Sequence, residues 1–141
     1  MEKELKPYLH KVQYYETDQM GMVHHSNYIR WFEEARVDFL DQIGLPFFML
    51  EQKGLFSPVV SVECRYQRPV KFGQSVLVFV TLESFERVKF CFSYRITDSE
   101  TGEVATLGKS SHCFLNGQGK IVSVAQEDPE SYQIICRYVG K

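Results

Sequence analysis

The hydrophobic residues of this chain follow two different periods, one in the first third and another in the remainder. Between residues 28 and 43, apolar side chains recur every three or four positions, as they do on one face of an α-helix. Charged residues of the same segment fall mostly on the other faces. The spacing predicts one long helix whose broad apolar stripe consists of Tyr28, Trp31, Phe32, Ala35, Phe39, Leu40 and Ile43.

Both ends of this helix carry suitable boundary residues. Ser26 or Asn27 can cap its first turn, and Gly44 followed by Pro46 ends it. A helix of about 17 residues is roughly 25 Å long. A second short helical turn or lid is expected at 47–53.

The rest of the chain alternates with a period of two, which is typical of β-strands. Segments 60–66 and 88–96 alternate in this way, so each is expected to have one buried and one solvated face. Segment 76–82 is a nearly continuous apolar run, and 104–115 is a further strand. Because the connections are short, consecutive strands must be antiparallel, and a leading strand at 8–16 brings the total to about five.

These elements predict a single α+β domain spanning residues 1–141, with an antiparallel sheet of about five strands wrapped around one central helix. A chain of 141 residues with 44% hydrophobic content can bury one core but hardly two. The run at 76–82 is too apolar to stay open at a sheet edge, so pairing between copies is expected. The tail at 126–141 is interpreted as a short helix or a surface extension.

Charge and composition exclude several classes of function. The net charge is −2 with dispersed Lys and Arg residues, which argues against nucleic-acid binding and a membrane anchor. No run reaches the roughly 18 apolar residues of a membrane span, and the charged N-terminus does not resemble a secretory signal, so a cytoplasmic protein is expected. The four cysteines lack paired short spacing, and His24 and His25 are adjacent, so neither disulfides nor a metal site is expected.

The segment just before the long helix concentrates chemically active side chains. Asp18, a glycine turn, His24 and His25 precede the helix start. An acid near a helix N-terminus lies where unpaired N–H groups and the positive end of the helix dipole can polarise a carbonyl oxygen. An Asp in such a turn also commonly accepts a backbone hydrogen bond, so these residues alone leave a purely structural role open.

Residues 14–28 read Tyr-Tyr-Glu-Thr-Asp-Gln-Met-Gly-Met-Val-His-His-Ser-Asn-Tyr, and residues 32–36 read Phe-Glu-Glu-Ala-Arg. This pattern resembles the signature of the 4-hydroxybenzoyl-CoA thioesterase-like branch of the hotdog-fold acyl-CoA thioesterases. The resemblance extends over nearly the whole chain in strand order and length, including 68–73. It implies a hotdog fold, a homodimer or homotetramer with active sites between subunits, an acyl-CoA substrate, and no cofactor apart from the coenzyme A of that substrate.

Carried over by position, the resemblance makes Asp18 the catalytic carboxylate, which attacks the thioester carbonyl or activates the attacking water. Thioesters are electrophilic and their thiolate departs readily, so no Ser–His–Asp relay is needed. Backbone N–H groups at 23–26 would polarise the carbonyl. His25 would orient water or substrate, and Tyr14 would bond Asp18 or the leaving group. The implied substrate-binding set is Val23, His24, Ser26, Asn27, Arg65 and Arg68.

This sequence departs from the family pattern at two places. His24 replaces a more usual aromatic residue, and Glu16-Thr17-Asp18 has one acid fewer than the usual run. Purely structural interpretations also stay open: His25 could be a hydrogen-bonded residue at the helix start, and Asn27 could be a cap.

Other candidate residues have mainly structural interpretations. Another hotdog branch carries its catalytic glutamate on the central helix, but Glu33 and Glu34 are expected to pair with Arg30 or Arg36 at helical spacing. His112, inside a strand, is expected to be structural. The expected cations for the coenzyme A phosphates are Arg65, Arg68, Lys71 and Lys109.

The acyl group and the function class stay open at this level. An apolar set suited to an aromatic or medium-chain acyl group, or equally to the core, comprises Trp31, Phe32, Phe47, Phe48, Met49 and Phe56. Three alternatives remain: a thioesterase for acyl groups on an acyl-carrier protein, a hotdog dehydratase, whose histidine and acid are placed differently, and a noncatalytic acyl-CoA-binding protein. Fold alone does not choose among them.

Overall fold

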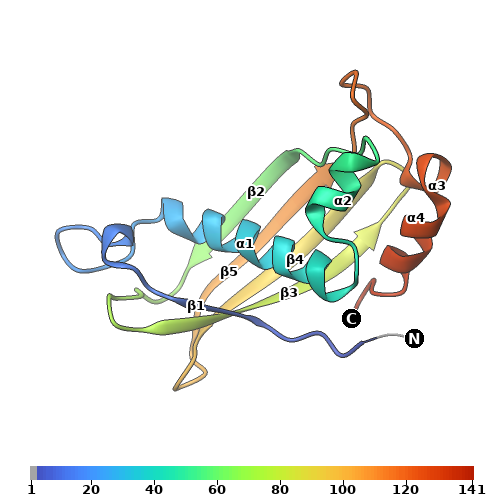
Figure 1. Ribbon diagram of the computed structural model, residues 1–141. Helices are drawn as coiled ribbons and strands as arrows, with labels where there is room; N and C mark the ends of the chain where they lie inside the picture. The colour runs from blue at the N-terminus through green and yellow to red at the C-terminus, as the bar shows by residue number, and fades with distance from the viewer. Residues whose placement is uncertain (1–2) are drawn as a thin grey trace.

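The computed structural model describes residues 3–141, and in it one long helix lies across one five-stranded sheet (Figure 1). The strands are β1 (Tyr8–Lys11), β2 (Val59–Tyr66), β3 (Ser75–Phe85), β4 (Lys89–Asp98) and β5 (Val104–Cys113). The helices are the 3-10 turn η1 (Tyr14–Glu16), α1 (Ser26–Gln42), α2 (Phe47–Gln52), α3 (Val124–Glu127) and α4 (Pro129–Cys136). The predicted α+β class and the antiparallel sheet with one long helix are confirmed.

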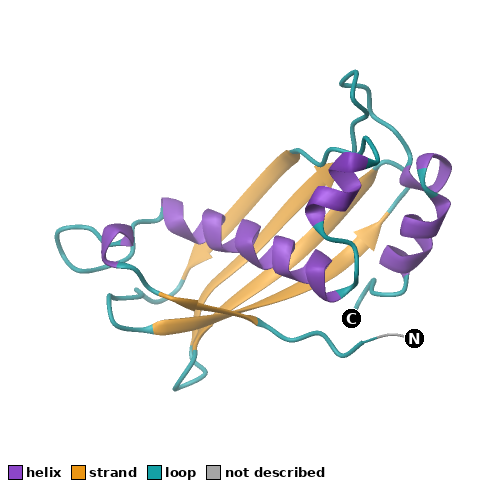
Figure 2. Ribbon diagram, viewed as in Figure 1, coloured by secondary structure: helices purple, strands orange, loops and turns teal. Residues whose placement is uncertain are grey.

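The strand order is β1-β3-β4-β5-β2, and every neighbouring pair is antiparallel. Figure 2 shows α1 crossing one face of the sheet, with α2 folded over the same face. The sheet therefore ends in two unlike edges: β1 has four residues and β2 has eight.

The stripe predicted for the long helix is the part of α1 that packs on the sheet. Trp31 and Phe32 are completely buried, and the Phe32 ring stacks on Tyr94 of β4 with centroids 4.2 Å apart. Beneath this contact lies Gly108 of β5, where an added Cβ would come within 2.3 Å of the Phe32 ring. Glycine at this position lets the helix approach the sheet closely.

Two predictions about strands were wrong. The leading strand stops at Lys11, because Gln13 and Glu16 form a capping box that turns the chain into η1. The apolar run at 76–82 is not an edge: β3 lies between β1 and β4, so that argument for pairing between copies fails.

The real edge strand, β2, has no buried face within one chain, contrary to the prediction. Val59, Val60, Val62 and Tyr66 are 38–62% exposed. An eight-residue edge strand with exposed valines is a ready template for pairing with another strand. The structure therefore moves the expected contact between copies from β3 to β2.

The helix boundaries also differ in detail from the prediction. His25 is the N-cap residue of α1 and makes no side-chain cap, so neither Ser26 nor Asn27 caps the helix. Glu33 and Glu34 form no ion pair with Arg30 or Arg36 within residues 3–141. The tail is helical, since α3 and α4 occupy most of 124–136.

Candidate active site

The Asp18 loop is a tight turn that holds one oxygen of the carboxylate and leaves the other unbound. Asp18 Oδ1 accepts hydrogen bonds from the N–H groups of Met20 (2.8 Å) and Met22 (3.2 Å). Gly21, with φ of 75°, supplies the left-handed backbone conformation that closes the turn. Oδ2 has no bonding partner in residues 3–141. The carboxylate is thus oriented and still has one oxygen available for chemistry.

This carboxylate borders an open cavity of about 370 Å³ at the start of α1. The cavity lies between the Asp18 loop, the residues preceding α1 and the end of β2. Its lining consists of Asp18, Met22, Val23, His24, His25, Tyr28, Tyr66, Gln67, Arg68 and Pro69.

Of the four backbone N–H groups predicted to polarise a carbonyl, three are already bonded. Val23 donates to the Val70 carbonyl (2.8 Å) and His24 to the Glu16 carbonyl (2.9 Å). The Ser26 N–H donates to His24 Nδ1 (3.2 Å). Within the described chain, only the His25 N–H of this group has no acceptor. Of the predicted donors, only the His25 N–H is therefore free to bind a carbonyl oxygen.

Glu16 organises this region, although the sequence interpretation gave it no role. Its buried carboxylate accepts hydrogen bonds from Trp31 Nε1 (2.7 Å), His10 Nε2 (2.9 Å) and the Gln13 N–H (2.8 Å). Burial alone would raise the pKa of Glu16, but these hydrogen bonds outweigh burial and lower the pKa below its ordinary value. The spacing of Gln13 and Glu16 is the available sequence signal, since it matches a capping box.

The backbone of Glu16 connects the loop to the helix. Its carbonyl accepts from the His24 N–H and from Asn27 Nδ2 (2.8 Å). Asn27 is buried, and its side-chain amide links the start of the helix to Glu16. Through Glu16, the Asp18 loop and the start of α1 are held in one fixed arrangement.

The two histidines lie together at the mouth of the cavity. Their rings stack with centroids 4.2 Å apart, and Tyr66 donates its hydroxyl to the His25 carbonyl (3.2 Å). His24 Nδ1 is 2.9 Å from Ser26 Oγ. Tyr14 lies elsewhere: its exposed ring packs edge-on against Phe72, and it makes no hydrogen bond to Asp18.

Of the four cations expected to meet phosphates, Arg68 alone lines this cavity. It forms an exposed ion pair with Glu103 (3.1 Å). Arg65 faces Leu107, one position away from the pair of Cys64 with Gly108 that lies under α1. Side chains alternate along a strand, so Arg65 and, by the same register, Lys109 point to the opposite face of the sheet.

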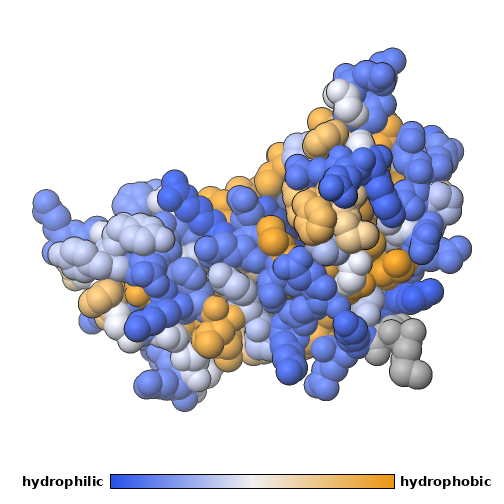
Figure 3. All heavy atoms as spheres, in the orientation of Figure 1, coloured by the Kyte–Doolittle hydropathy of each residue, from blue (hydrophilic) through white to orange (hydrophobic). Residues whose placement is uncertain are grey.

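A second cavity, of about 600 Å³ and largely apolar, lies between the second half of α1, α2 and the sheet. Of the predicted acyl-binding set, Phe47 and Phe48 line it, Trp31 and Phe32 belong to the core, and the lining includes neither Met49 nor Phe56. Figure 3 shows apolar residues gathered at α2 on an otherwise largely hydrophilic face. The aromatic lining consists of Phe39, Phe47, Phe48, Phe85, Phe90, Phe92, Phe114 and His112.

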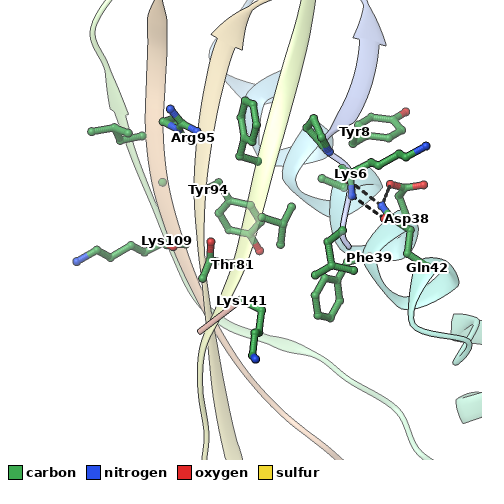
Figure 4. Close-up of a pocket in the computed structure, with 18 residues that line it drawn as sticks. Lys6, Tyr8, Asp38, Phe39, Gln42, Thr81, Tyr94, Arg95, Lys109 and Lys141 are labelled. Atoms are coloured by element: carbon green, nitrogen blue, oxygen red, sulfur yellow. Dashed lines mark hydrogen bonds between the residues drawn. The ribbon is translucent and has the colours of Figure 1, made fainter. Parts of the chain in front are cut away.

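A third cavity, of about 510 Å³, lies where the N-terminal segment crosses the second half of α1 (Figure 4). The backbone of Lys6 exchanges two hydrogen bonds with the Gln42 side chain (2.8 and 2.9 Å), and Gln42 also donates to Asp38 (2.8 Å). These contacts fasten the N-terminal segment to the helix. None of the predicted catalytic residues lies here.

In residues 3–141, no group of three His, Cys, Asp or Glu side chains could hold a metal ion, and none of the helices combines the length and apolar character needed to cross a bilayer.

Comparison with known proteins places this geometry in context. The sequence profile of the Thioesterase-like superfamily matches residues 12–130. An Aquifex aeolicus protein named for an expected esterase activity is 41% identical over 120 residues, which cover 85% of this chain and 91% of that protein. A Bacillus subtilis protein named for an expected acyl-CoA thioesterase activity is 35% identical over 102 residues, covering 72% and 73%. The crystal structure of a DHNA-CoA thioesterase from Staphylococcus aureus superimposes with a TM-score of 0.89 at 27% identity, covering 94% of this chain and 89% of that one.

Proposed function

The chain belongs to the thioesterase-like superfamily, and from this premise we propose that it hydrolyses acyl-CoA thioesters to a free acid and coenzyme A, with Asp18 as the reactive carboxylate. The observation that carries the proposal is the oriented Asp18 carboxylate, with one unbound oxygen, in the same cavity as the free N–H of His25. The resemblance to acyl-CoA thioesterases supplies the substrate class.

The chemistry follows from these two groups. Asp18 Oδ2 attacks the thioester carbonyl carbon, or removes a proton from the water that attacks it. The carbonyl oxygen gains negative charge, which the His25 N–H and the positive end of the α1 dipole stabilise. Collapse of the tetrahedral intermediate breaks the C–S bond and releases coenzyme A as a thiolate, which then takes up a proton. Direct attack leaves an anhydride on Asp18, and water hydrolyses it.

The proposed assembly is a dimer joined through β2, alone or within a tetramer. The exposed valines of β2 and its unpaired backbone edge support this assignment. Two copies of one edge strand paired about a two-fold axis run antiparallel. If the strands overlap fully, the Tyr66 end of one β2 lies beside the Val59 end of the partner strand. The Asp18 cavity of each chain then opens toward the other chain.

The direct test is the release of free thiol from a panel of acyl-CoAs by wild type and by Asp18→Asn. We expect the substitution to lower kcat by at least about 100-fold, because it removes a nucleophile or general base while keeping the shape of the side chain. Asp41→Asn is the matched control, since Asp41 is an exposed carboxylate near the other end of α1. Its activity should equal that of wild type.

Each other result has a definite meaning. If wild type releases thiol from no acyl-CoA, the proposed activity is wrong. In that case, hydrolysis of acyl groups on an acyl-carrier protein would identify the first alternative, and binding of acyl-CoA without turnover would identify the noncatalytic one. If Asp18→Asn keeps full activity, the role of Asp18 is wrong.

A further inference from the structure

A series of hydrogen-bonded polar side chains connects two residues that line the largely apolar cavity between α1, α2 and the sheet. Arg36 Nη1 of α1 donates to the Tyr94 hydroxyl of β4 (3.0 Å). The Tyr94 hydroxyl lies 2.5 Å from Ser110 Oγ of β5, and Ser110 Oγ lies 2.7 Å from His112 Nε2. Arg36 and His112 both line the cavity.

The bond from Arg36 to Tyr94 has a fixed direction, because a guanidinium only donates. The backbone of Pro58 beside the His112 ring has no N–H, so a hydrogen bond there has the ring as its donor. Burial, and then the Arg36 charge, lowers the pKa of His112 to about 4, so the ring is neutral at pH 7 and has one N–H. Nε2 must therefore accept from Ser110, Ser110 from Tyr94, and Tyr94 from Arg36.

Arg36 has donors left over after this arrangement. A guanidinium carries five N–H groups, and the hydrogen bond to Tyr94 uses one of them. Within residues 3–141, no carboxylate lies within ion-pair distance of Arg36. A half-buried, permanently charged side chain at the wall of an apolar cavity gains from any hydrogen-bond acceptor brought to it.

The charges around the cavity favour an uncharged acceptor. Glu33 and Glu51 are exposed and also line the cavity, so two carboxylates accompany the single Arg36 cation. An incoming anion would meet both of them. A neutral oxygen on an apolar body avoids this repulsion, suits the phenylalanine lining and still accepts from the guanidinium.

We propose that Arg36 is a specificity-determining residue that donates to a neutral oxygen on the acyl group, and that it acts on the thioester held by the partner's Asp18 loop. The inference rests on the proposed function. Within one chain, Arg36 lies about three turns along α1 from the His25 N–H, about 16 Å along the helix axis, which is longer than a small acyl group. Antiparallel pairing of two β2 strands brings each cavity beside the other chain's Asp18 cavity.

The test compares kcat/KM for two nearly isosteric substrates, 4-hydroxybenzoyl-CoA and 4-methylbenzoyl-CoA, in thiol-release assays. Wild type should prefer the hydroxyl substrate by about 10-fold or more, since a hydrogen bond to a charged group discriminates strongly. Arg36→Met should abolish the preference while retaining turnover of the methyl substrate, and Arg36→Lys should keep part of it. Tyr94→Phe, which removes the group that positions Arg36, should lower the preference about three-fold or more.

Arg30→Met is the matched control, because Arg30 lies on the same helix and does not line the cavity. Its preference should equal that of wild type. A loss of fold in any variant would lower turnover of both substrates together, whereas the proposal requires a change in their ratio. 4-Carboxybenzoyl-CoA adds a third arm, and it should be a poorer substrate than the hydroxyl compound.

The outcomes separate the two proposals. If wild type hydrolyses neither substrate nor any other acyl-CoA, the proposed function fails. If wild type hydrolyses both benzoyl substrates and Arg36→Met leaves their ratio unchanged, the role of Arg36 is overturned and the thioesterase proposal stands. A preference for the carboxylate substrate would overturn the requirement for a neutral acceptor.

Discussion

The two ends of α1 position polar groups in opposite ways. At its start, Asp18 is held by two backbone N–H groups of its own loop, those of Met20 and Met22, in an open cavity. Along its second half, Arg36 is held by Tyr94 of β4, whose hydroxyl also contacts Ser110 of β5, in a cavity whose walls are mostly apolar. The first arrangement depends on residues close in sequence and is open to solvent. The second depends on the packing of the sheet.

This difference suggests a division of labour between reaction and selection. A carboxylate that reacts with varied thioesters needs a fixed direction and room for water. A site that distinguishes one acyl group from another needs buried donors, because an unpaired buried donor penalises the wrong ligand. Changes at the first end should therefore alter turnover, and changes at the second should alter preference and stability.

The largest expected effect comes from preventing dimer formation, which would separate the Asp18 cavity of one chain from the Arg36 cavity of the other. Val62→Asp places a charge on the exposed face of β2, which should prevent pairing of two copies and lower kcat/KM by at least about 100-fold. Analytical ultracentrifugation and the thiol-release assay check both consequences. Val88→Asp is the control, since Val88 is equally exposed, at 38%, but lies outside β2. A monomeric Val62→Asp protein with full activity would refute the composite site.

Glu16→Gln should produce the next largest effect, and it should act on turnover. The amide places an N–H group against the donors Trp31 and His10, so the Asp18 loop loses its anchor. We expect kcat to fall about 10-fold and the free energy of unfolding to fall by about 2 kcal/mol. The ratio of hydroxyl to methyl substrate should stay at the wild-type value. A change in that ratio would mean that the two ends of α1 are not independent.

His112, which lines the same cavity as Arg36, should make the free energy of unfolding depend on pH. Its pKa is about 4 in the folded protein and near 6.5 when unfolded, so the unfolded state alone takes up the proton between these values. The stabilisation is complete above pH 6.5 and is lost as the pH falls toward 4, by about 2 to 3 kcal/mol. Denaturant unfolding of wild type and His112→Asn at one protein concentration measures this difference. Identical pH profiles for the two proteins would contradict the neutral buried ring.

Gly108→Ala should have the smallest effect. The new Cβ would displace the Phe32 ring, which stacks on Tyr94, so the free energy of unfolding should fall by about 1 to 2 kcal/mol. A partial loss of the preference for the hydroxyl substrate should accompany it. Thermal unfolding and the substrate ratio give the two readouts. Unchanged stability would show that the contact between α1 and β5 is looser than described.

The same division explains which features were predictable from the sequence. The α1 stripe, the alternating strands and the Asp18 loop are all local patterns, and the structure contains them. The β2 edge was missed because strand order depends on crossovers, which periodicity does not show. The chain from Arg36 to His112 was missed because its members come from α1, β4 and β5, and only their packing brings them together.

Mixing two variants that each lack one part of the proposed composite site shows most directly whether Asp18 and Arg36 act together across the interface. Asp18→Asn and Arg36→Met chains are unfolded together, refolded at equal concentrations and assayed with 4-hydroxybenzoyl-CoA. About half of the dimers would be mixed, and each of these would combine the intact Asp18 of one chain with the intact Arg36 of the other at one of its two sites. The mixture should therefore regain roughly a quarter of the wild-type kcat/KM, with the wild-type preference for hydroxyl. If the mixture shows only the average of the two separate variants, Asp18 and Arg36 do not act on one substrate across the interface, and the proposed composite site is wrong.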